Sequence, residues 1–462
     1  MLNKEVRTRF APSPTGGLHI GSMRTILFNW LHAKNKNGKF LLRIEDTDKD
    51  RNQEDAVKKI FDSMNWLNLK HDEEVVIQSN NIERHKEVAL KLLAEGKAYK
   101  CFATQEELDE MRQKAIDNKQ TPKYDRRWRD VCESKHPDKD FVIRLKAPLN
   151  GFTEFKDLVL GDCKVNNEHM DDMILLRSNG VPTYMLAVVV DDHDMKITDV
   201  VRGGEHLNNA YRQKQIYDAC GWECPNFAHI PLIHAEDGTK LSKRTGAVDI
   251  LEYKKQGFLP QALLNYLVRL GWSYKDKEIM SMDECVELFD ITKVGSSPAR
   301  FNLDKMLSVN SHYLKEMEDV DFFNAVELFA KESSLSFDYG KEARERGIKG
   351  SAEVKVRVRT LLEAYEMLLI FLEGPGFFGK IENCEIINHL ILEAEKNPWE
   401  ADAQSWLREK IAEKEGKLKD VAKKLRVALT KKTVSPSLFE IMQFIGPDIF
   451  VQRLKNSIKV DI

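Results

Sequence analysis

The chain has 462 residues, enough for about three domains of ordinary size. Hydrophobic residues make up 42% of it and charged residues 31%, and the charges nearly cancel to a net −3. This composition excludes a disordered chain, which would combine low hydrophobicity with a large net charge. It also argues against a protein that binds polyanions through its overall charge, although a local basic face is compatible with it.

The sequence also bears on where the protein works. No apolar run approaches the roughly 18 residues that a membrane span needs, and the first residues lack the apolar segment of a signal peptide. The seven cysteines are odd in number and scattered, without a CxxC pair, a pattern typical of reduced thiols. We therefore expect a soluble, cytoplasmic protein of several domains that has no membrane partner.

The first elements of the chain form a strand–turn–helix–strand pattern. Residues 5–11 read as extended, and Pro12 to Gly17 are turn formers. Apolar residues then recur at the period of a helix over 22–33, and 40–44 reads as a buried strand. In a parallel α/β sheet this order places the turn at the carboxyl edge of the strands, where ligands bind.

Between residues 98 and 182 charged helical stretches alternate with short strands, and we predict that this region is an insertion. The sheet is expected to resume after it, with a strand over 181–190 and further elements beyond. The other elements predicted in these two regions are a helix over 106–118, short strands over 141–145, 155–160 and 172–177, a strand over 197–202 and a helix over 210–217.

From residue 259 onward the pattern is helical, with helical stretches over 260–270 and 354–372 and a dividing loop near 374–376. Residues 408–432 carry ten Lys and Arg against four Asp and Glu. On its own, such a stretch is more often a solvated helix face than a binding surface.

A glycine-rich turn carries the first chemical signal. Gly16, Gly17 and Gly21 would let a nucleotide lie against the backbone at the start of a helix, whose free N–H groups suit a phosphate. His19 adds a hydrogen-bond donor. The turn is not a phosphate-binding loop of the Walker type, because Ser22 stands where that motif needs Lys. Alone, it is more often a tight turn.

The second signal is a basic loop. Lys240, Lys243 and Arg244 lie within five residues, between Gly238 and Gly246. Three cations in a compact loop repel one another unless a polyanion lies among them, and mobile lysines can stabilise charge on transferring phosphates. By itself this segment too could be a solvated surface loop.

Together the two segments resemble the HIGH and KMSKS signatures of class I aminoacyl-tRNA synthetases, with Ser22 in place of the last His and KLSKR as the second motif. Further strings resemble the bacterial glutamyl-tRNA synthetases over essentially the whole chain: RFAPSPTG from Arg9, RIEDTD from Arg43, PTY from Pro182, VDDH from Val190, VRGGEH from Val201 and LRVALT from Leu425.

The resemblance implies an α/β fold: a Rossmann-type parallel-sheet catalytic domain with an α+β insertion, followed by an all-α anticodon-binding region. The domains it implies are the first catalytic half (1–97), an inserted domain that binds the tRNA acceptor end (98–182), the second catalytic half (183–240), a stem-contact region with the KLSKR loop (241–320), and a helical anticodon-binding domain (321–462) with a subdomain boundary near 375.

The implied reaction is the activation of L-glutamate by ATP with Mg²⁺, followed by transfer to the terminal adenosine of tRNA. It needs positioning and charge neutralisation more than a general base. By resemblance the catalytic residues are His19, Gly21, Lys240 and Lys243. ATP binding would add Glu205 and Ser242.

Glutamate itself needs a cation for its side-chain carboxylate and an anion for its ammonium. By resemblance Arg202 and Arg9 supply the first and Glu45 the second. Ala11, Ser13 and Tyr184 complete the substrate-binding set. Two arginines would disfavour a neutral glutamine by about 1.5–3 kcal/mol, which makes an editing domain unnecessary.

The helical half is expected to hold tRNA, with Arg357, Arg359 and Arg426 as candidate contacts, and the basic stretch over 408–432 becomes a plausible phosphate-facing surface. In the insertion, the candidates for RNA contact are Arg126, Arg127 and Arg129 with Tyr124 and Trp128.

The chain departs from the family pattern at two places. Many relatives carry zinc in the insertion, but Ala103 and Trp128 replace two of its thiols beside Cys101. Since tetrahedral zinc needs four ligands, we predict no structural zinc. Met185 and Val188 replace a His and an Asn after Tyr184, so the pocket loses one polar contact.

Several alternatives stay open. The chain could be a paralogue or a non-discriminating form that also charges glutamine tRNA, or a non-catalytic tRNA-binding protein. A shortened relative that modifies a tRNA base lacks the anticodon-binding domain, and small adenylyltransferases of the HxGH type usually lack a helical half. We expect a monomer.

Overall fold

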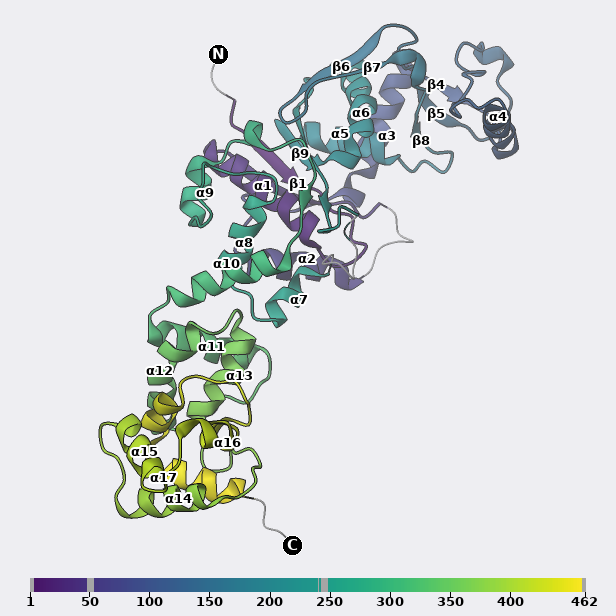
Figure 1. Cartoon of the computed structure of the whole chain (residues 1–462). Coiled ribbons are helices and arrows are strands. Elements are labelled where there is room, and N and C mark those ends of the chain that lie inside the picture. The colour runs from purple at the N-terminus through teal and green to yellow at the C-terminus, as the bar shows by residue number, and fades with distance from the viewer. Residues whose placement is uncertain (1–3, 48–53, 240, 242–247, 459–462) are drawn as a thin grey trace. The chain divides into compact units, whose positions relative to one another are not determined.

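The computed structural model describes residues 4–47, 54–239, 241 and 248–458. The chain divides into two compact units (Figure 1). Unit 1 holds Met1–Ile250 and Leu264–Asn302, and unit 2 holds Leu251–Leu263 and Leu303–Ile462. Within the described residues, no helix is long and apolar enough to cross a membrane.

Unit 1 is built on parallel strands. Its core strands are β1 (Arg7–Phe10), β2 (Lys39–Ile44), β3 (Val76–Ile77), β9 (Asp199–Gly203) and β10 (Asn226–Ile230). β2 pairs in parallel with β1 and β3, and β9 pairs in parallel with β10. The two ladders adjoin, because the N–H of Thr198 donates to the carbonyl of Arg7 at 3.0 Å. The predicted Rossmann-like parallel core is confirmed.

Helices cover this core. They are α1 (Ile20–Asn35), α2 (Glu54–Trp66), α3 (Ile82–Ala94), α5 (Tyr184–Asp194), α6 (Leu207–Cys220) and α9 (Met282–Leu288). α3, α5 and α6 lie together in Figure 1 and share one apolar cluster that includes Val88, Val189 and Ile216. The first helix, α1, extends beyond its predicted range at both ends.

The predicted strand over 181–190 is wrong, since most of that segment forms α5. A short apolar run does not distinguish a buried strand from a buried helix by periodicity. Here every residue from Leu186 to Asp192 is buried. The run is therefore apolar because the helix is enclosed on all sides.

The predicted insertion contributes to two different sheets. β4 (Ala98–Cys101), β5 (Val142–Leu145) and β8 (Ile174–Leu176) form an antiparallel sheet, which α4 (Gln105–Asp117) accompanies. The hairpin β6 (Phe152–Asp157) and β7 (Gly161–Asn166) instead joins β10 in parallel, with Asp157 opposite Phe227. The predicted domain boundaries stay predictions.

The strand predicted over 155–160 lies earlier in the chain, as β6. It ends at Asp157 because the carboxylate of that residue accepts the N–H groups of Val159 and Leu160, both at 2.9 Å. This turn reverses the chain before Gly161, whose φ of 79° suits glycine.

Aromatic side chains surround Cys101 and Trp128, in the region where many relatives carry zinc. The thiol of Cys101 donates to the Tyr124 hydroxyl at 3.2 Å, and the Arg144 guanidinium lies 3.9 Å from the centroid of the Tyr124 ring. Trp128 packs edge-on against Phe102. Among described residues, no group of three His, Cys, Asp or Glu could hold a metal, and the zinc expectation stays a prediction.

Unit 2 is helical where it is described, which confirms the predicted all-α region. Its helices from Leu303 onward are α10 (Leu303–Lys315), α11 (Asp319–Glu332), α12 (Lys341–Lys355), α13 (Leu361–Leu372), α14 (Glu385–Lys396), α15 (Ala403–Ala412), α16 (Leu418–Thr430) and α17 (Leu438–Ser457). The stretch predicted over 354–372 is broken before Thr360, whose hydroxyl caps α13 by accepting from the Glu363 N–H.

A single buried arginine joins three helices of unit 2. Arg453 of α17 has no exposed surface and donates to the carbonyls of Leu429, Ile370 and Glu373 at 2.6–3.0 Å. These carbonyls lie at the C-terminal ends of α13 and α16. Carbonyls at that end of a helix have no hydrogen-bond partner within the helix itself. Burial lowers the pKa of Arg453 to about 10.

Replacing Arg453 by Met should reduce the free energy of unfolding by about 1–3 kcal/mol, because the buried carbonyls would lose a charged donor. Urea unfolding followed by circular dichroism measures this. Lys423→Met, at an exposed position of α16, should change stability by less than about 0.5 kcal/mol. Equal stability of the two variants would contradict the assignment.

Candidate active site

The proline-rich turn follows β1 and leads directly into α1. The Pro12 carbonyl accepts the N–H of Glu45 at 2.9 Å, which fixes the turn to the end of β2. His19 caps the helix, since its Nδ1 accepts the N–H groups of Gly21 and Ser22 at 3.1 and 3.3 Å. An accepting Nδ1 leaves Nε2 as the ring nitrogen that can donate.

The segment that follows the basic loop lies against this turn. His19 and Asp249 form an antiparallel bridge, and the Ile250 N–H donates to the Leu18 carbonyl at 2.7 Å. A side chain at Gly17 would overlap the Asp249 carboxylate. Asp249, which lies downstream of the basic loop, is therefore packed against the histidine turn.

The other end of the basic loop is held by a parallel bridge of two short strands, β11 (Ile233–His234) and β12 (Ala299–Arg300). The Asn302 amide donates to Glu236 at 2.8 Å. Lys240, Ser242 and Lys243 lie outside the described residues, so their roles stay predictions.

A pocket of about 210 Å³ opens beside the turn. It brings together eight predicted site residues: Arg9, Ala11, His19, Gly21, Glu45, Tyr184, Arg202 and Glu205. It is also lined by Arg24, Thr25 and His206, none of which was predicted as a site residue. Ser13 is exposed and does not line this pocket.

A buried network of charges forms one wall. Arg43 is completely buried and donates to Asp192 at 2.6 Å and to Glu45 at 3.0 Å. The Nε of Arg9 donates to the same Asp192 oxygen at 3.1 Å. Burial alone would raise the pKa of Asp192, but the two guanidinium groups outweigh it and hold that pKa below its usual range.

A second carboxylate supports the network from behind. Asp191 lies 3.8 Å from the Arg43 Nε and accepts from the amides of Gln78 and Asn81 at 2.8 and 2.9 Å. Its first oxygen also lies 2.8 Å from the Nε2 of the buried His85. The acidic pair at the end of α5 therefore fixes both Arg9 and Arg43.

Arg202 forms the other wall and is paired differently. Its Nε donates to the Nε2 of His229 at 3.2 Å, and its two amino groups, Nη1 and Nη2, are buried without a hydrogen-bond partner among the described residues. Burial lowers the pKa of Arg202. A buried cation without a counter-ion is costly, so an anionic ligand at this position would be strongly favoured.

Arg24 connects α1 to the base of the basic loop. It is 3% exposed and donates to the carbonyl of Pro231 and, at 2.9 Å, to that of Leu270, directly after α8 (Pro260–Arg269). Burial lowers its pKa to about 10. Its sequence position on the predicted helix, one turn after the histidine motif, was the only available signal.

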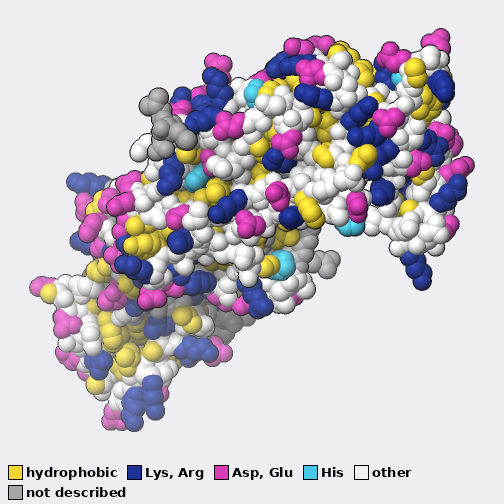
Figure 2. Space-filling view, turned by 90° about the horizontal axis from the view of Figure 1, so that it is seen from above, with side chains coloured by type: hydrophobic (Ala, Val, Ile, Leu, Met, Phe, Trp, Pro, Cys, Tyr) yellow, Lys and Arg dark blue, Asp and Glu magenta, His cyan; other side chains and the backbone are white. Residues whose placement is uncertain are grey.

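The candidate RNA contacts of the insertion are largely paired within the protein. Arg126 and Arg129 both donate to the buried Asp172, and Arg127 pairs with Asp125 and Glu107. Figure 2 shows the same mixing on the face in view, where positive and negative side chains are interspersed. These arginines are better explained as structural ion pairs.

The three candidate tRNA contacts of unit 2 also have local partners. Arg357 pairs with Glu353 at 2.6 Å, and Arg359 pairs more loosely with Glu363 at 3.4 Å. Arg426 donates to the Ser435 hydroxyl and so ties α16 to the following loop. Arg359, with a side chain 52% exposed, is the most accessible of the three.

Comparison with known families agrees with this geometry. The family model described as tRNA synthetases class I (E and Q), catalytic domain, matches residues 5–308, and a model described as an anticodon binding domain matches residues 309–458. The chain belongs to this class I synthetase family. It is therefore an aminoacyl-tRNA ligase, and enzymes of this class use ATP as a substrate.

Similar proteins match almost the whole chain. A glutamate–tRNA ligase of Afipia carboxidovorans is 46% identical over 98% of this chain and 99% of its own length. Glutamate–tRNA ligase 2 of Rickettsia bellii is also 46% identical, over 98% of this chain and 100% of its own length. A solved glutamate–tRNA ligase from Elizabethkingia meningosepticum, in complex with its amino acid, is 29% identical, with a TM-score of 0.84 over 98% of this chain and 99% of that one.

In Gly17→Ala the added methyl group would overlap the Asp249 carboxylate, so that side chain would have to move away from the histidine turn. Displacing Asp249 should slow ATP–pyrophosphate exchange measured with tRNA present, with little loss of stability. Gly204→Ala is the matched control, since its Cβ would lie 3.4 Å from the Ile230 carbonyl, an ordinary contact. Similar exchange rates in both variants would contradict this role.

Proposed function

We propose that this synthetase activates L-glutamate with ATP and transfers it to the 3′-terminal adenosine of tRNA(Glu), as a monomer in the cytoplasm. The relatives that match it over nearly their full length carry the name glutamate–tRNA ligase. The single structural observation that supports glutamate is the buried Arg202 guanidinium, whose amino groups lack partners among the described residues.

The charges of the pocket match an acidic amino acid. On the wall around Arg43, two guanidinium groups face three carboxylates, so the formal balance there is −1 and favours an ammonium group at Glu45. Opposite it, Arg202 supplies a cation without a counter-ion among the described residues. Glutamate satisfies both, whereas glutamine would leave Arg202 without a charge-assisted bond.

The first step needs no general base. The α-carboxylate oxygen of glutamate attacks the α-phosphorus of ATP, the bond to the β-phosphate breaks, and pyrophosphate leaves. We propose that His19, through Nε2–H, binds the phosphates where Gly21 leaves room for them, with Lys240, Ser242 and Lys243 closing over them. In the second step a ribose hydroxyl of the terminal adenosine attacks the anhydride carbonyl and AMP leaves.

Mg²⁺ would accompany ATP and neutralise phosphate charge. The described residues contain no group of three or more His, Cys, Asp or Glu side chains that could hold a metal ion. We therefore assign no protein ligand to it and derive no step through it.

The choice of tRNA depends on unit 2. We propose Arg359 as its first contact, with Arg357 and Arg426 supporting the surrounding loops. Charging of tRNA(Gln) with glutamate remains the alternative within the family. Aminoacylation of purified glutamate and glutamine tRNAs, assayed side by side, distinguishes the two, and glutamate-dependent AMP formation excludes a non-catalytic tRNA-binding protein.

Arg202→Met should raise the KM for glutamate by about 10- to 150-fold, the equivalent of about 1.5–3 kcal/mol for a charged hydrogen bond. The KM for ATP should change little, and the preference for glutamate over glutamine should fall. Arg84→Met, which removes an exposed ion pair with Asp194, is the control. An unchanged glutamate KM in Arg202→Met would refute the proposed binding mode.

Glu45 should make glutamate binding sensitive to acid. Burial raises the pKa of Glu45, although Arg43 opposes that rise. As the pH falls, Glu45 therefore takes up a proton sooner than an ordinary carboxyl group and loses its attraction for the ammonium group. The KM for glutamate should rise toward acid pH in the wild type, and should be high and much less pH-dependent in Glu45→Gln. Parallel pH profiles would contradict the assignment.

A further inference from the structure

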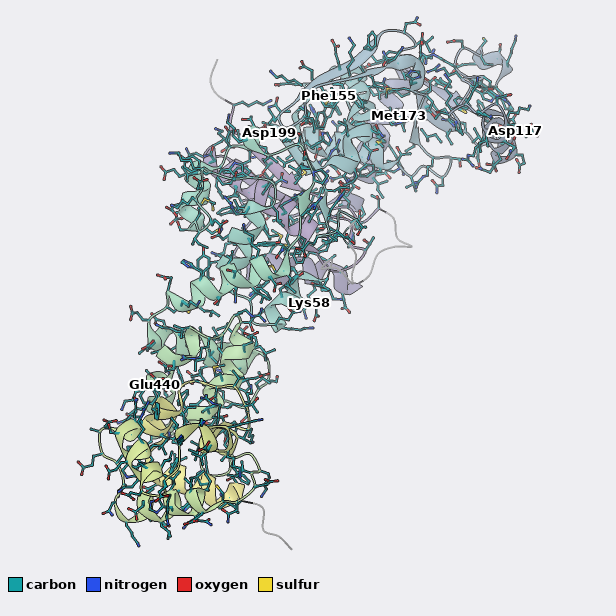
Figure 3. The ribbon with its side chains drawn as sticks, viewed as in Figure 1. Lys58, Asp117, Phe155, Met173, Asp199 and Glu440 are labelled. Carbon is teal, nitrogen blue, oxygen red and sulfur yellow. The ribbon has the colours of Figure 1, made fainter. Side chains whose placement is uncertain are left out.

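Three buried side chains, joined by hydrogen bonds, lie in a row across three neighbouring strands. Asp157 ends β6, His229 lies on β10 and Arg202 lies on β9. The Asp157 carboxylate is 2.6 Å from Nδ1 of His229, and the Arg202 Nε is 3.2 Å from Nε2 of the same ring. Asp157 and His229 are 1% and 0% exposed. Phe155, labelled in Figure 3, shields them from the same strand by packing on Phe227.

The hydrogen bonds of His229 to Asp157 and Arg202 favour one protonation state of its ring. Burial would raise the pKa of Asp157, but His229 and the backbone N–H groups of Leu160 and Val159 hold it below its usual range. An ionised Asp157 can only accept, so Nδ1 of His229 must carry the hydrogen. The Nε–H of Arg202 can only donate, so Nε2 must carry a lone pair. The ring is therefore neutral and protonated at Nδ1.

The surroundings of the ring agree with a neutral imidazole. The charged or titratable groups that face it are Asp157 from β6, Arg202 from β9 and His206 from the turn after β9. Burial lowers the pKa of His229, and the neighbouring Arg202 cation lowers it further. Hydrogen bonds to Asp157 and to the backbone of His206 oppose this shift without outweighing it. A protonated ring would bring two cations face to face.

The bond to His229 also decides which edge of Arg202 meets the ligand. A guanidinium group can bind a carboxylate through Nε and one amino group or through both amino groups. Because Nε is occupied by His229, only Nη1 and Nη2 remain. The Phe227 ring, 5.3 Å from the guanidinium carbon, supports the group from one side.

We propose that Asp157 and His229 are positioning residues for substrate specificity. Asp157 fixes the tautomer of His229, and His229 holds Arg202 so that Nη1 and Nη2 face the carboxylate of an acidic amino acid. Neither residue touches the substrate. The identity of the ligand as glutamate rests on the proposed function, whereas the tautomer and the fixed orientation of Arg202 do not.

Asp157→Asn tests this with almost no change in volume. If the Asn oxygen keeps the backbone N–H groups of Val159 and Leu160, its NH₂ group faces Nδ1 of His229. That nitrogen must then accept, the hydrogen moves to Nε2, and two donors oppose each other at Arg202. In the Ser-His-Asp triad, a buried Asp likewise holds a His in one tautomer, and Asn in its place puts the His in the wrong one.

We expect Asp157→Asn to raise the KM for glutamate about 10- to 100-fold, the range typical of the partners that support metal-binding side chains. The KM for ATP and the affinity for tRNA should stay close to the wild-type values, and the preference for glutamate over glutamine should fall. A loss of overall structure would instead reduce all of these together.

Two variants of His229 provide the matched comparison. His229→Gln keeps one acceptor for Arg202 and one donor for Asp157, so it should retain much of the glutamate affinity. His229→Leu has neither and should resemble Asp157→Asn. If Gln and Leu at position 229 give the same glutamate KM, the proposed positioning of Arg202 by His229 is refuted, and His229 has only a packing role.

Nuclear magnetic resonance of protein labelled with ¹⁵N-histidine tests the tautomer directly. The His229 signals, identified by their loss in His229→Gln, should show a hydrogen on Nδ1 in the wild type and on Nε2 in Asp157→Asn. This readout needs no catalysis, so it still tests the hydrogen bonds from Asp157 through His229 to Arg202 if the wild-type protein fails to charge glutamate. A wild-type ring protonated at Nε2 would overturn the proposal even where charging is normal.

Discussion

The pairing of buried charge around Arg43 is the constraint on which the site depends. A guanidinium group without exposed surface is tolerated only if carboxylates surround it, and Asp191, Asp192 and Glu45 do so from two different elements. The same contacts fix the end of β2 against the end of α5. Arg9 on β1 is held by Asp192 as well. The network therefore sets the positions of three core elements and shapes one wall of the pocket.

On the other side of the pocket, close contacts fix the start of α1. α1 begins where the chain must also accommodate Asp249, and glycine at position 17 leaves the space for it. Arg24, one turn into α1, donates to carbonyls that precede β11 and follow α8. The helix α1 thus also holds the segments that precede β11 and follow α8.

Local features of this architecture were readable from sequence, and long-range pairing was not. The turn formers and the helical period identified the β1–α1 unit, and the resemblance pointed to Glu45 and Arg202, which line one pocket. The apolar run over 181–190 suggests a strand because a helix buried on all sides has no polar face. Arg43 and Asp192 are 149 positions apart, and Asp157 and His229 are 72 apart. No spacing rule in a single sequence connects such residues.

The two walls of the pocket differ in how their charges are satisfied, and the proposed selectivity for glutamate follows from this difference. The charge of Arg9 is already compensated by Asp192, so a ligand gains less from it. Arg202 is desolvated in the folded protein, and its amino groups have no counter-ion among the described residues. The cost of burying that cation is met during folding, and only an anionic side chain recovers it on binding. A neutral amide of the same shape cannot, so under the proposed function the site would discriminate by charge where shape alone would fail.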